Sequence, residues 1–246
     1  MTSPGVCVQG LCFSYRSREV FSGLNVGFEP GLNFLVGENG AGKTTLFHLV
    51  RGALRPGGGS VELTGESPAP PARRAVGFLP QTFSIAPHLT VRQFVEYMAW
   101  VRGVSRRLVA ARASEALVSV GMESREGDRV GALSGGMVRR VGIAQAVTSD
   151  ASLLLLDEPT SGLDPVQRAE VRRWFERLAE GRTVVVSTHL LDDVPGDEAR
   201  LAVIGGGGAL FQGPAGRLRD EMTSSDGSGR PSLDEAFVRL STSRRP

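Results

Sequence analysis

Four short segments of the chain carry mostly apolar or β-branched side chains without the alternation of a half-exposed strand. They are Leu32–Val36, Val76–Leu79, Leu153–Leu156 and Thr183–Ser187. Turn residues bound these segments, and continuous apolarity of this length is typical of strands buried on both faces. We therefore expect them to pair in a mainly parallel sheet.

A helical spacing of apolar side chains lies between the third and fourth of these segments. The residues at positions i, i+3, i+4 and i+7 are Val171, Trp174, Phe175 and Leu178. Pro165 near the start and Gly181 after the end are typical helix boundaries. The alternation of strands and helices indicates an α/β fold.

The N-terminal region has a different pattern. Residues 1–30 contain short strand-like segments at Phe13–Tyr15 and Asn25–Phe28, separated by turn residues, and they predict an antiparallel β portion. Glycine- and proline-rich stretches further along predict connections at Arg55–Ser60 and Gly65–Ala72.

The middle of the chain is predicted to be helical. Residues 90–130 contain no clear strand, whereas Val91–Val101 and Leu108–Val120 have helical character. We expect an α-helical subdomain at about residues 84–148, inserted into the α/β core.

The C-terminal end is predicted to be a separate short unit. Thr223–Ser232 has the composition of a flexible linker and precedes a predicted helix at Leu233–Leu240. The expected organisation is therefore one domain over residues 1–222, followed by a linker and helix over residues 223–246.

A phosphate-binding pattern follows the first predicted parallel strand. The segment 37–44 reads GENGAGKT and fits G-x-x-x-x-G-K-[ST], between the strand Leu32–Val36 and a predicted helix at Thr44–Val50. Phosphate requires backbone N–H groups turned inward, which glycine permits, and a helix N-terminus adds a favourable dipole. The candidate nucleotide ligands here are Gly37, Asn39, Gly40, Gly42, Lys43, Thr44 and Thr45.

Lys43 is the only lysine among 28 basic residues. In this pattern its ammonium group binds the β- and γ-phosphates of a nucleoside triphosphate, and the Thr44 hydroxyl is a ligand of Mg²⁺. The alternative is a glycine-rich turn with a chance lysine, which the flanking strand and helix disfavour.

Two carboxylates end the predicted strand of four leucines. Asp157 is placed to hold Mg²⁺, directly or through water, and Glu158 to polarise an attacking water molecule. A polar strand terminus without chemistry is the alternative for two adjacent carboxylates.

The segment Leu133–Met137 reads LSGGM and precedes a predicted helix whose residues Met137, Val141, Ala144 and Thr148 share one face. With the phosphate loop and the two carboxylates in this order, the sequence resembles the nucleotide-binding subunit of ATP-binding cassette (ABC) transporters. The resemblance extends over nearly the whole chain. It implies a P-loop NTPase fold, with ATP and Mg²⁺ as cofactors.

The resemblance also implies roles for residues that would be uninformative alone. Tyr15 stands where the family stacks adenine, and Gln81 matches a loop that senses the Mg²⁺ site and the membrane partner. Asp164 matches a loop that touches a second subunit, and His189 a histidine that contacts the γ-phosphate. Each could otherwise be a structural residue: a strand aromatic, a surface amide or a strand-end histidine.

The segment Leu133–Met137 corresponds to the signature motif of the family, and its two glycines predict a second anion site. Ser134 stands at an N-cap position, and Gly135 and Gly136 expose amide groups at the start of a helix. The resemblance implies that two copies face each other head to tail, so that ATP lies between the phosphate loop of one and the signature of the other. The implied homodimer interface includes Ser134, Gly136 and Asp164.

The sequence departs from the family pattern at three positions. Met137 stands where the signature usually has Gln, Gly162 where Ala is commoner, and Ala199 where an acidic residue often precedes the arginine. The candidate catalytic residues Glu158 and His189 and the candidate metal ligands Thr44, Gln81 and Asp157 are all present. We therefore expect an active Mg-dependent ATPase.

Composition limits the kinds of binding partner and the cellular compartment that we expect. A net charge of +2 with arginines scattered along the chain argues against nucleic acid as a partner. Cys7 and Cys12 have neither disulfide nor zinc spacing and are expected to be small buried residues in a reducing compartment. No signal peptide or spanning segment is visible, so we expect a cytoplasmic protein that binds a separate permease at the cytoplasmic face of the membrane.

The predicted function is to power export through that permease. The segments Ser161–Pro165 and Ser232–Phe237 look like those of bacterial exporters of drugs, antibiotics and lipid-like molecules. The alternatives are an importer subunit and a soluble ABC ATPase acting on ribosomes or DNA. The latter usually has two cassettes or a long insertion, whereas only about 50 residues separate Gln81 from Leu133 here.

Overall fold

The computed structural model describes residues 5–63, 76–223 and 229–243 and contains two sheets flanked by helices. Sheet A has the order β2-β1-β4 and is antiparallel. Sheet B has the order β5-β6-β7-β3-β8-β9 and is parallel except for β9. The strands are β1 (Val6–Tyr15), β2 (Arg18–Phe28), β3 (Gly31–Val36), β4 (Gly58–Leu63), β5 (Val76–Leu79), β6 (Leu153–Asp157), β7 (Thr183–Thr188), β8 (Arg200–Gly205) and β9 (Gly208–Pro214).

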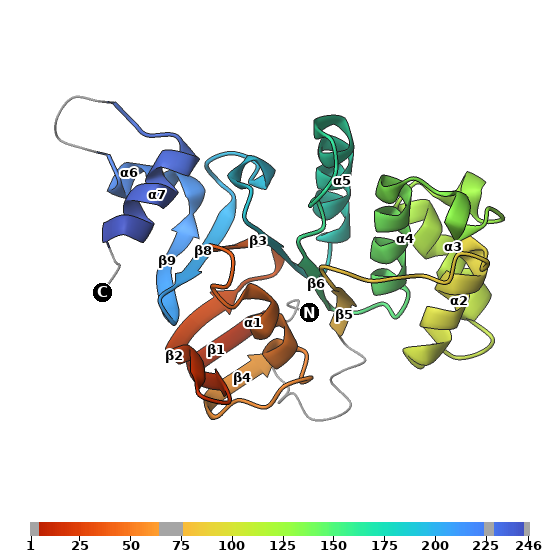
Figure 1. Cartoon of the computed structure of the whole chain (residues 1–246). Helices are drawn as coiled ribbons and strands as arrows, with labels where there is room; N and C mark the ends of the chain where they lie inside the picture. The colour runs from red at the N-terminus through yellow and green to blue at the C-terminus, as the bar shows by residue number, and fades with distance from the viewer. Residues whose placement is uncertain (1–4, 64–75, 224–228, 244–246) are drawn as a thin grey trace.

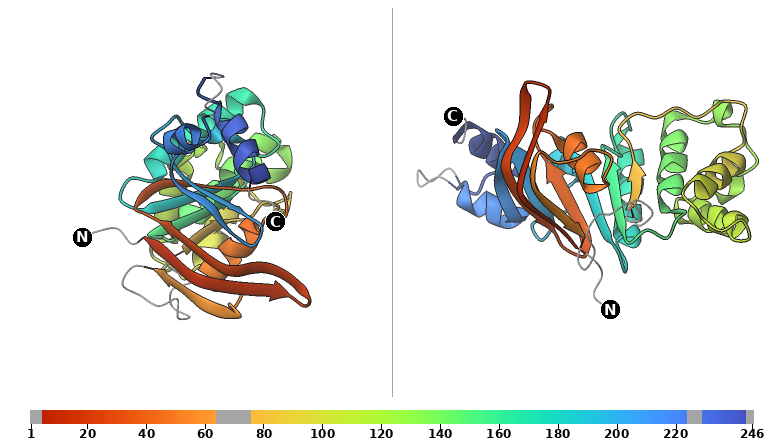
Figure 2. Two further views of the ribbon diagram at one scale, coloured as in Figure 1. Left: turned by 90° about the vertical axis from the view of Figure 1, so that its left-hand side faces the viewer. Right: turned by 90° about the horizontal axis from the view of Figure 1, so that it is seen from below.

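Seven α-helices complete the described fold. They are α1 (Lys43–Val50), α2 (Val91–Val101), α3 (Val109–Ser119), α4 (Gly135–Val147), α5 (Pro165–Leu178), α6 (Ala215–Glu221) and α7 (Leu233–Ser243). Helices α2, α3 and α4 form a group at one end of the molecule, and α6 and α7 lie at the opposite end (Figures 1 and 2). The fold is thus the predicted mixed α/β architecture, with a helical group between β5 and β6.

Two apolar cores lie on opposite faces of sheet B. Alternate residues of its strands, such as Leu155 and Val185, pack with α1 and sheet A. Their neighbours, such as Leu154 and Val184, pack with residues of the other helices. This two-sided burial explains why the parallel strands appear as unbroken apolar runs in the sequence.

The four predicted parallel strands and the predicted helices before α6 are confirmed within one or two residues. The predicted N-terminal strands Phe13–Tyr15 and Asn25–Phe28 are only the ends of the longer strands β1 and β2. The C-terminal helix α7 extends to Ser243, three residues beyond the predicted end. The predicted connection Gly65–Ala72 lies outside the described residues, as do positions 224–228 of the predicted linker.

Two expectations for the N-terminal half are wrong. The predicted connection Arg55–Ser60 overlaps β4, because Gly58 pairs with Cys12 of β1 and so extends sheet A. The cysteines are not buried: Cys7 is half-buried and Cys12 exposed. Cys7 alternates with the buried Val6 and Val8 and so points to the other face of sheet A.

Candidate functional site

The site is built where three parallel strands end at the same edge of sheet B. Strand β7 lies between β6 and β3, with Asp157 aligned with Ser187 and Val36 aligned with Thr188. The loops that follow these strands therefore meet. They carry the Gly-rich segment after Val36, Glu158 and His189.

The Gly-rich segment turns sharply because of Gly42. This residue has φ 101° at the N-cap of α1, and a Cβ there would lie 2.7 Å from the Phe21 ring. No other residue type fits this conformation and this contact without strain. Since Gly42 offers no side-chain cap to α1, the first-turn amides are left to other acceptors.

Lys43 is buried at the first position of α1, with 6% of its surface exposed. Its Nζ donates hydrogen bonds to the carbonyl oxygens of Gly37 at 2.7 Å and Glu38 at 3.2 Å. Nζ also lies 3.9 Å from Glu158 Oε1. Burial lowers the pKa of Lys43, and the carboxylates of Glu158 and Asp157 partly oppose that change.

Asp157 lies behind the Gly-rich loop and is held by two hydroxyl groups. Thr44 Oγ1 donates to Asp157 Oδ2 at 2.7 Å, and Ser187 Oγ donates to Oδ1. Asp157 is 1% exposed, so these donors compensate for much of the lost hydration of its carboxylate. The arrangement ties helix α1 to the end of β6.

Glu158 has an unusual backbone conformation, with φ 46°. Its amide donates to the carbonyl oxygen of Ser187 at 3.1 Å and to Ser187 Oγ at 3.0 Å, which holds the chain in this turn. Its Oε2 accepts from Gln81 Nε2 at 3.0 Å, and its Oε1 lies 3.2 Å from His189 Nδ1. Positive φ in a non-glycine residue carries strain that clusters at functional sites.

An open cavity of about 560 Å³ brings most of the predicted residues together, a size within the range of small-molecule sites. The predicted residues that line it are Tyr15, Asn39, Gly40, Gly42, Lys43, Thr44, Thr45, Gln81, Glu158 and His189. Three further lining residues were missed by the sequence analysis: Arg18, Val20 and Ser161. Arg18, the first residue of β2, adds a positive charge to the cavity lining, and it belongs to no recognisable sequence motif.

Arg139 is a fourth residue that the sequence did not predict, and it connects α4 to the loops that carry Gln81 and Glu158. Its guanidinium donates to the carbonyl oxygens of Gln81 at 2.9 Å, Asp157 at 2.7 Å and Pro159 at 3.0 Å, and also to that of Glu158. Burial lowers its pKa to about 10, partly opposed by the nearby carboxylates. Only the tertiary structure reveals this function, because the acceptors are backbone atoms.

The signature residues do not line this cavity in the described part of the chain. Ser134 is the N-cap of α4, and its Oγ accepts from Met137 N at 3.3 Å. A Cβ on Gly136 would lie 2.9 Å from Gln167 Oε1 in α5. Asp164 caps α5 by accepting from Gln167 N at 2.9 Å, so the starts of α4 and α5 form one surface.

Two of the departures from the family pattern have structural consequences. Met137 is partly buried and packs against the core beneath α4, a contact that a thioether side chain supports. Gly162 has φ 77°, a conformation that glycine adopts more readily than alanine.

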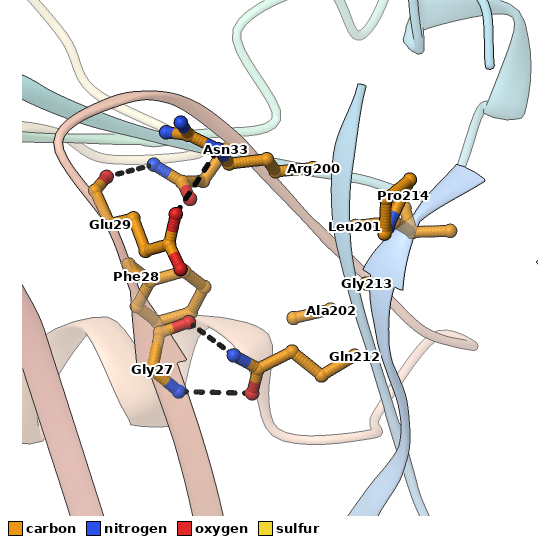
Figure 3. A pocket seen from close by; sticks show the side chains of 10 residues that line it. All are labelled: Gly27, Phe28, Glu29, Asn33, Arg200, Leu201, Ala202, Gln212, Gly213 and Pro214. Atoms are coloured by element: carbon orange, nitrogen blue, oxygen red, sulfur yellow. Dashed lines mark hydrogen bonds and ion pairs between the residues drawn. The ribbon is translucent and has the colours of Figure 1, made fainter. Parts of the chain in front are cut away.

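A smaller cavity of about 230 Å³ lies where the edges of the two sheets meet (Figure 3). The Gln212 side-chain amide exchanges two hydrogen bonds of 3.1 Å with the Gly27 backbone. Asn33 Nδ2 donates to the Glu29 carbonyl at 2.8 Å, and Arg200 lies 3.5 Å from the Glu29 carboxylate. Because these polar groups pair with one another, we interpret the cavity as a structural contact between β2 and β9 and not as a ligand site.

The sequence pattern of the ABC transporter family matches residues 21–161, more than half of the chain. An uncharacterized ABC transporter ATP-binding protein, YxlF of Bacillus subtilis, is 34% identical over 221 residues, which cover 89% of this chain and 74% of that protein. The Nod factor export ATP-binding protein I of Rhizobium etli is 35% identical over 215 residues, covering 85% and 68%.

Solved structures of ABC transporter subunits also resemble this chain. Among them is cbiO1 from Clostridium perfringens, described as part of the ABC transporter complex cbiONQ. It superposes with a TM-score of 0.76 at 27% identity and covers 88% of this chain and 90% of its own. Within the described ranges, no helix combines the length and apolarity needed to cross a membrane.

Proposed function

The chain belongs to the ABC transporter family as an ATP-binding and ATP-hydrolysing subunit, and from this premise we propose that its cavity of about 560 Å³ is the ATP site. The observation that supports this most strongly is the convergence of Lys43, Gln81, Glu158 and His189 from four separate segments. The first-turn amides of α1 and the ammonium of Lys43 bind the phosphates, and Tyr15, 46% exposed at the rim, stacks on adenine.

Mg²⁺ fits the oxygen donors at the base of this site. The described residues contain no group of three or more His, Cys, Asp or Glu side chains that could hold a metal alone. Mg²⁺ in nucleotide sites instead takes one or two protein oxygens and completes its shell with phosphates and water. Thr44 Oγ1 and Asp157 Oδ2, 2.7 Å apart, would supply those oxygens, with Gln81 beside them.

Hydrolysis is assigned to the carboxylate of Glu158 and the imidazole of His189. Glu158 accepts a proton from the attacking water, and Gln81 and His189 orient its two oxygens. His189 is about one-third exposed, so its Nε2 side can reach the γ-phosphate while Nδ1 faces Glu158. Lys43 offsets the negative charge that collects on the transferred phosphoryl group.

The complete site is proposed to form between two copies. The starts of α4 and α5 present Ser134, Gly136 and Asp164 on one surface away from the cavity, so one chain cannot apply both anion sites to one nucleotide. In a head-to-tail homodimer the signature of one copy closes the ATP cavity of the other. ATP then favours the closed state because only that state makes both sets of contacts.

A complementation experiment tests the shared site. Lys43→Ala and Ser134→Arg should each prevent ATP-dependent dimerisation, since each damages both sites of a homodimer. Mixing the two variants leaves one site with an intact Lys43 and an intact Ser134. We expect mixed dimers with one bound ATP, measured by analytical ultracentrifugation with labelled nucleotide.

Both variants are combined with Glu158→Gln so that bound ATP is not consumed. A mixture that remains monomeric and empty, while Glu158→Gln alone dimerises, would exclude the head-to-tail arrangement. The Arg55→Ala variant, an exposed change of one charge outside both surfaces, serves as the control.

The membrane partner is proposed to dock on the helical group. Helix α2 and the turn that leads to α3 expose several large apolar side chains: Tyr97 at 56%, Trp100 at 61%, Val101 at 53% and Leu108 at 51%. Exposed aromatic clusters of this kind are typical of protein–protein contacts. Such a contact places the subunit at the cytoplasmic face of the membrane, where the permease supplies the transport path.

We expect Trp100→Ala to reduce co-purification with the co-expressed permease partner by about tenfold, the effect of an interface hot spot. ATP hydrolysis by the isolated chain should stay unchanged, because Trp100 does not line the ATP cavity. Val238→Ala, which truncates an exposed side chain of α7, should not affect co-purification. Equal recovery of the permease with Trp100→Ala would refute this docking surface.

Export is the proposed direction. Its support is the similarity to a Nod factor export ATP-binding protein, together with the export-like segments Ser161–Pro165 and Ser232–Phe237. The substrate is set by the permease, because the residues of the ATP site bind only the nucleotide. ATP-dependent accumulation of substrate in inverted vesicles would support export, and accumulation in right-side-out vesicles would support import.

A further inference from the structure

A fully buried carboxylate lies between the loops that follow β6 and β7. Asp193 has 0% exposure and ends a short 3-10 helix, Leu191–Asp193, just after His189. Its Oδ2 accepts hydrogen bonds from Thr160 Oγ1 at 2.5 Å and Thr188 Oγ1 at 2.9 Å. Its Oδ1 is buried and has no hydrogen-bond partner within the described residues.

This arrangement is costly for folding. A buried acceptor without a partner loses its hydration without compensation. A carboxylate at this position is therefore poorly explained by stability alone. The two hydroxyl groups that donate to Oδ2 indicate instead that Asp193 positions the loops after β6 and β7.

Each threonine belongs to one side of the ATP site. Thr160 lies two residues after Glu158, in the loop that leads to Asp164. Thr188 directly precedes His189, and its Oγ1 also accepts from Leu190 N at 2.9 Å, which closes a turn around His189. Both threonines are 1% exposed, so their hydroxyl groups are shielded from competing water.

We propose that Asp193 is a positioning residue for ATP hydrolysis. By binding Thr160 and Thr188 through one oxygen, it fixes the loop of Glu158 relative to the loop of His189, whose side chains lie 3.2 Å apart. The loop held through Thr160 also leads to Asp164. This inference rests on the proposed roles of Glu158 and His189.

Asp193→Ala should lower kcat for ATP hydrolysis by about tenfold or more, since small displacements of reacting groups cost rate steeply. KM for ATP should change by less than about threefold, because Asp193 does not line the cavity and the phosphate loop is untouched. Asp193→Asn keeps an acceptor oxygen for both hydroxyl groups and should retain most of the activity. Asp192→Ala, a change at the exposed neighbouring acid, is the matched control.

A second variant, Thr160→Val, removes one of the two connections and preserves side-chain shape. As a single change, Thr160→Val should lower kcat. The double variant Thr160→Val/Asp193→Ala should have a kcat no lower than that of Asp193→Ala. Wild-type kcat in Asp193→Ala, equal losses in Asp193→Asn and Asp193→Ala, or additive losses in the double variant would each overturn the proposal. If Asp193→Ala fails to fold, wild-type kcat in Thr160→Val overturns it.

Glu158→Gln, measured in parallel, distinguishes an error in the proposed catalytic site from an error in the positioning role of Asp193. If Glu158→Gln hydrolyses ATP at the wild-type rate, the proposed catalytic site itself is wrong. If Glu158→Gln is inactive while the Asp193 and Thr160 variants match wild type, only the positioning role of Asp193 is refuted.

Discussion

Glu158→Gln should bind ATP as tightly as the wild type but hydrolyse it about 10²- to 10⁴-fold more slowly, the usual contribution of a general base. Glutamine has nearly the same shape as glutamate, so the position between Gln81 and His189 remains filled. It cannot accept the proton of the attacking water, however. Phosphate release under single-turnover conditions measures the loss.

The same variant should accumulate as an ATP-bound dimer. ATP holds the two copies together in the proposed closed state, and hydrolysis is the step that separates them. Size-exclusion chromatography with ATP should therefore show a shift from monomer to dimer for Glu158→Gln and a smaller shift for wild type.

The matched control is Glu176→Gln, which makes the same chemical change at an exposed position of α5. It should hydrolyse ATP like the wild type. A near wild-type rate in Glu158→Gln would show that another group polarises the water.

Lys43→Ala should weaken ATP binding by about 30- to 4,000-fold, since truncating one partner of a buried charged contact costs about 2–5 kcal/mol. Lys43 is 6% exposed, and its ammonium interacts electrostatically with the nearby carboxylates of Glu158 and Asp157. Without it, the triphosphate and two carboxylates would repel one another across a poorly hydrated site. Isothermal calorimetry gives the Kd directly.

No other lysine can substitute for Lys43, because the chain contains only one. Arg55→Ala, which removes one positive charge at an exposed position, should bind ATP normally and so controls for net charge. Thermal unfolding of both variants controls for folding, because Lys43 also donates to the carbonyl oxygens of Gly37 and Glu38. Micromolar ATP binding retained by Lys43→Ala would contradict the proposed phosphate loop.

Much of the fold could be predicted from local patterns. Strands β3, β5, β6 and β7 are buried on both faces and so are continuous apolar runs in the sequence. Helix α5 has a spaced apolar face and clear boundaries. Strand β4 was not predicted, because its glycines form a strand only through pairing with β1. The same limit applies to β8 and β9, which complete sheet B through long-range pairing.

The sequence by itself determined the chemistry of the proposed ATP site, because its motifs place defined groups at fixed spacings from strand ends and helix starts. The loop before α1 with Lys43, and the pair Asp157 and Glu158 after β6, need little more than their local structure. Only the tertiary structure decided which groups support them. Arg139 acts through backbone carbonyls, and Asp193 through two threonines 33 and 5 residues away. Such contacts follow no local period, since they depend on which loops the order of strands in sheet B brings together.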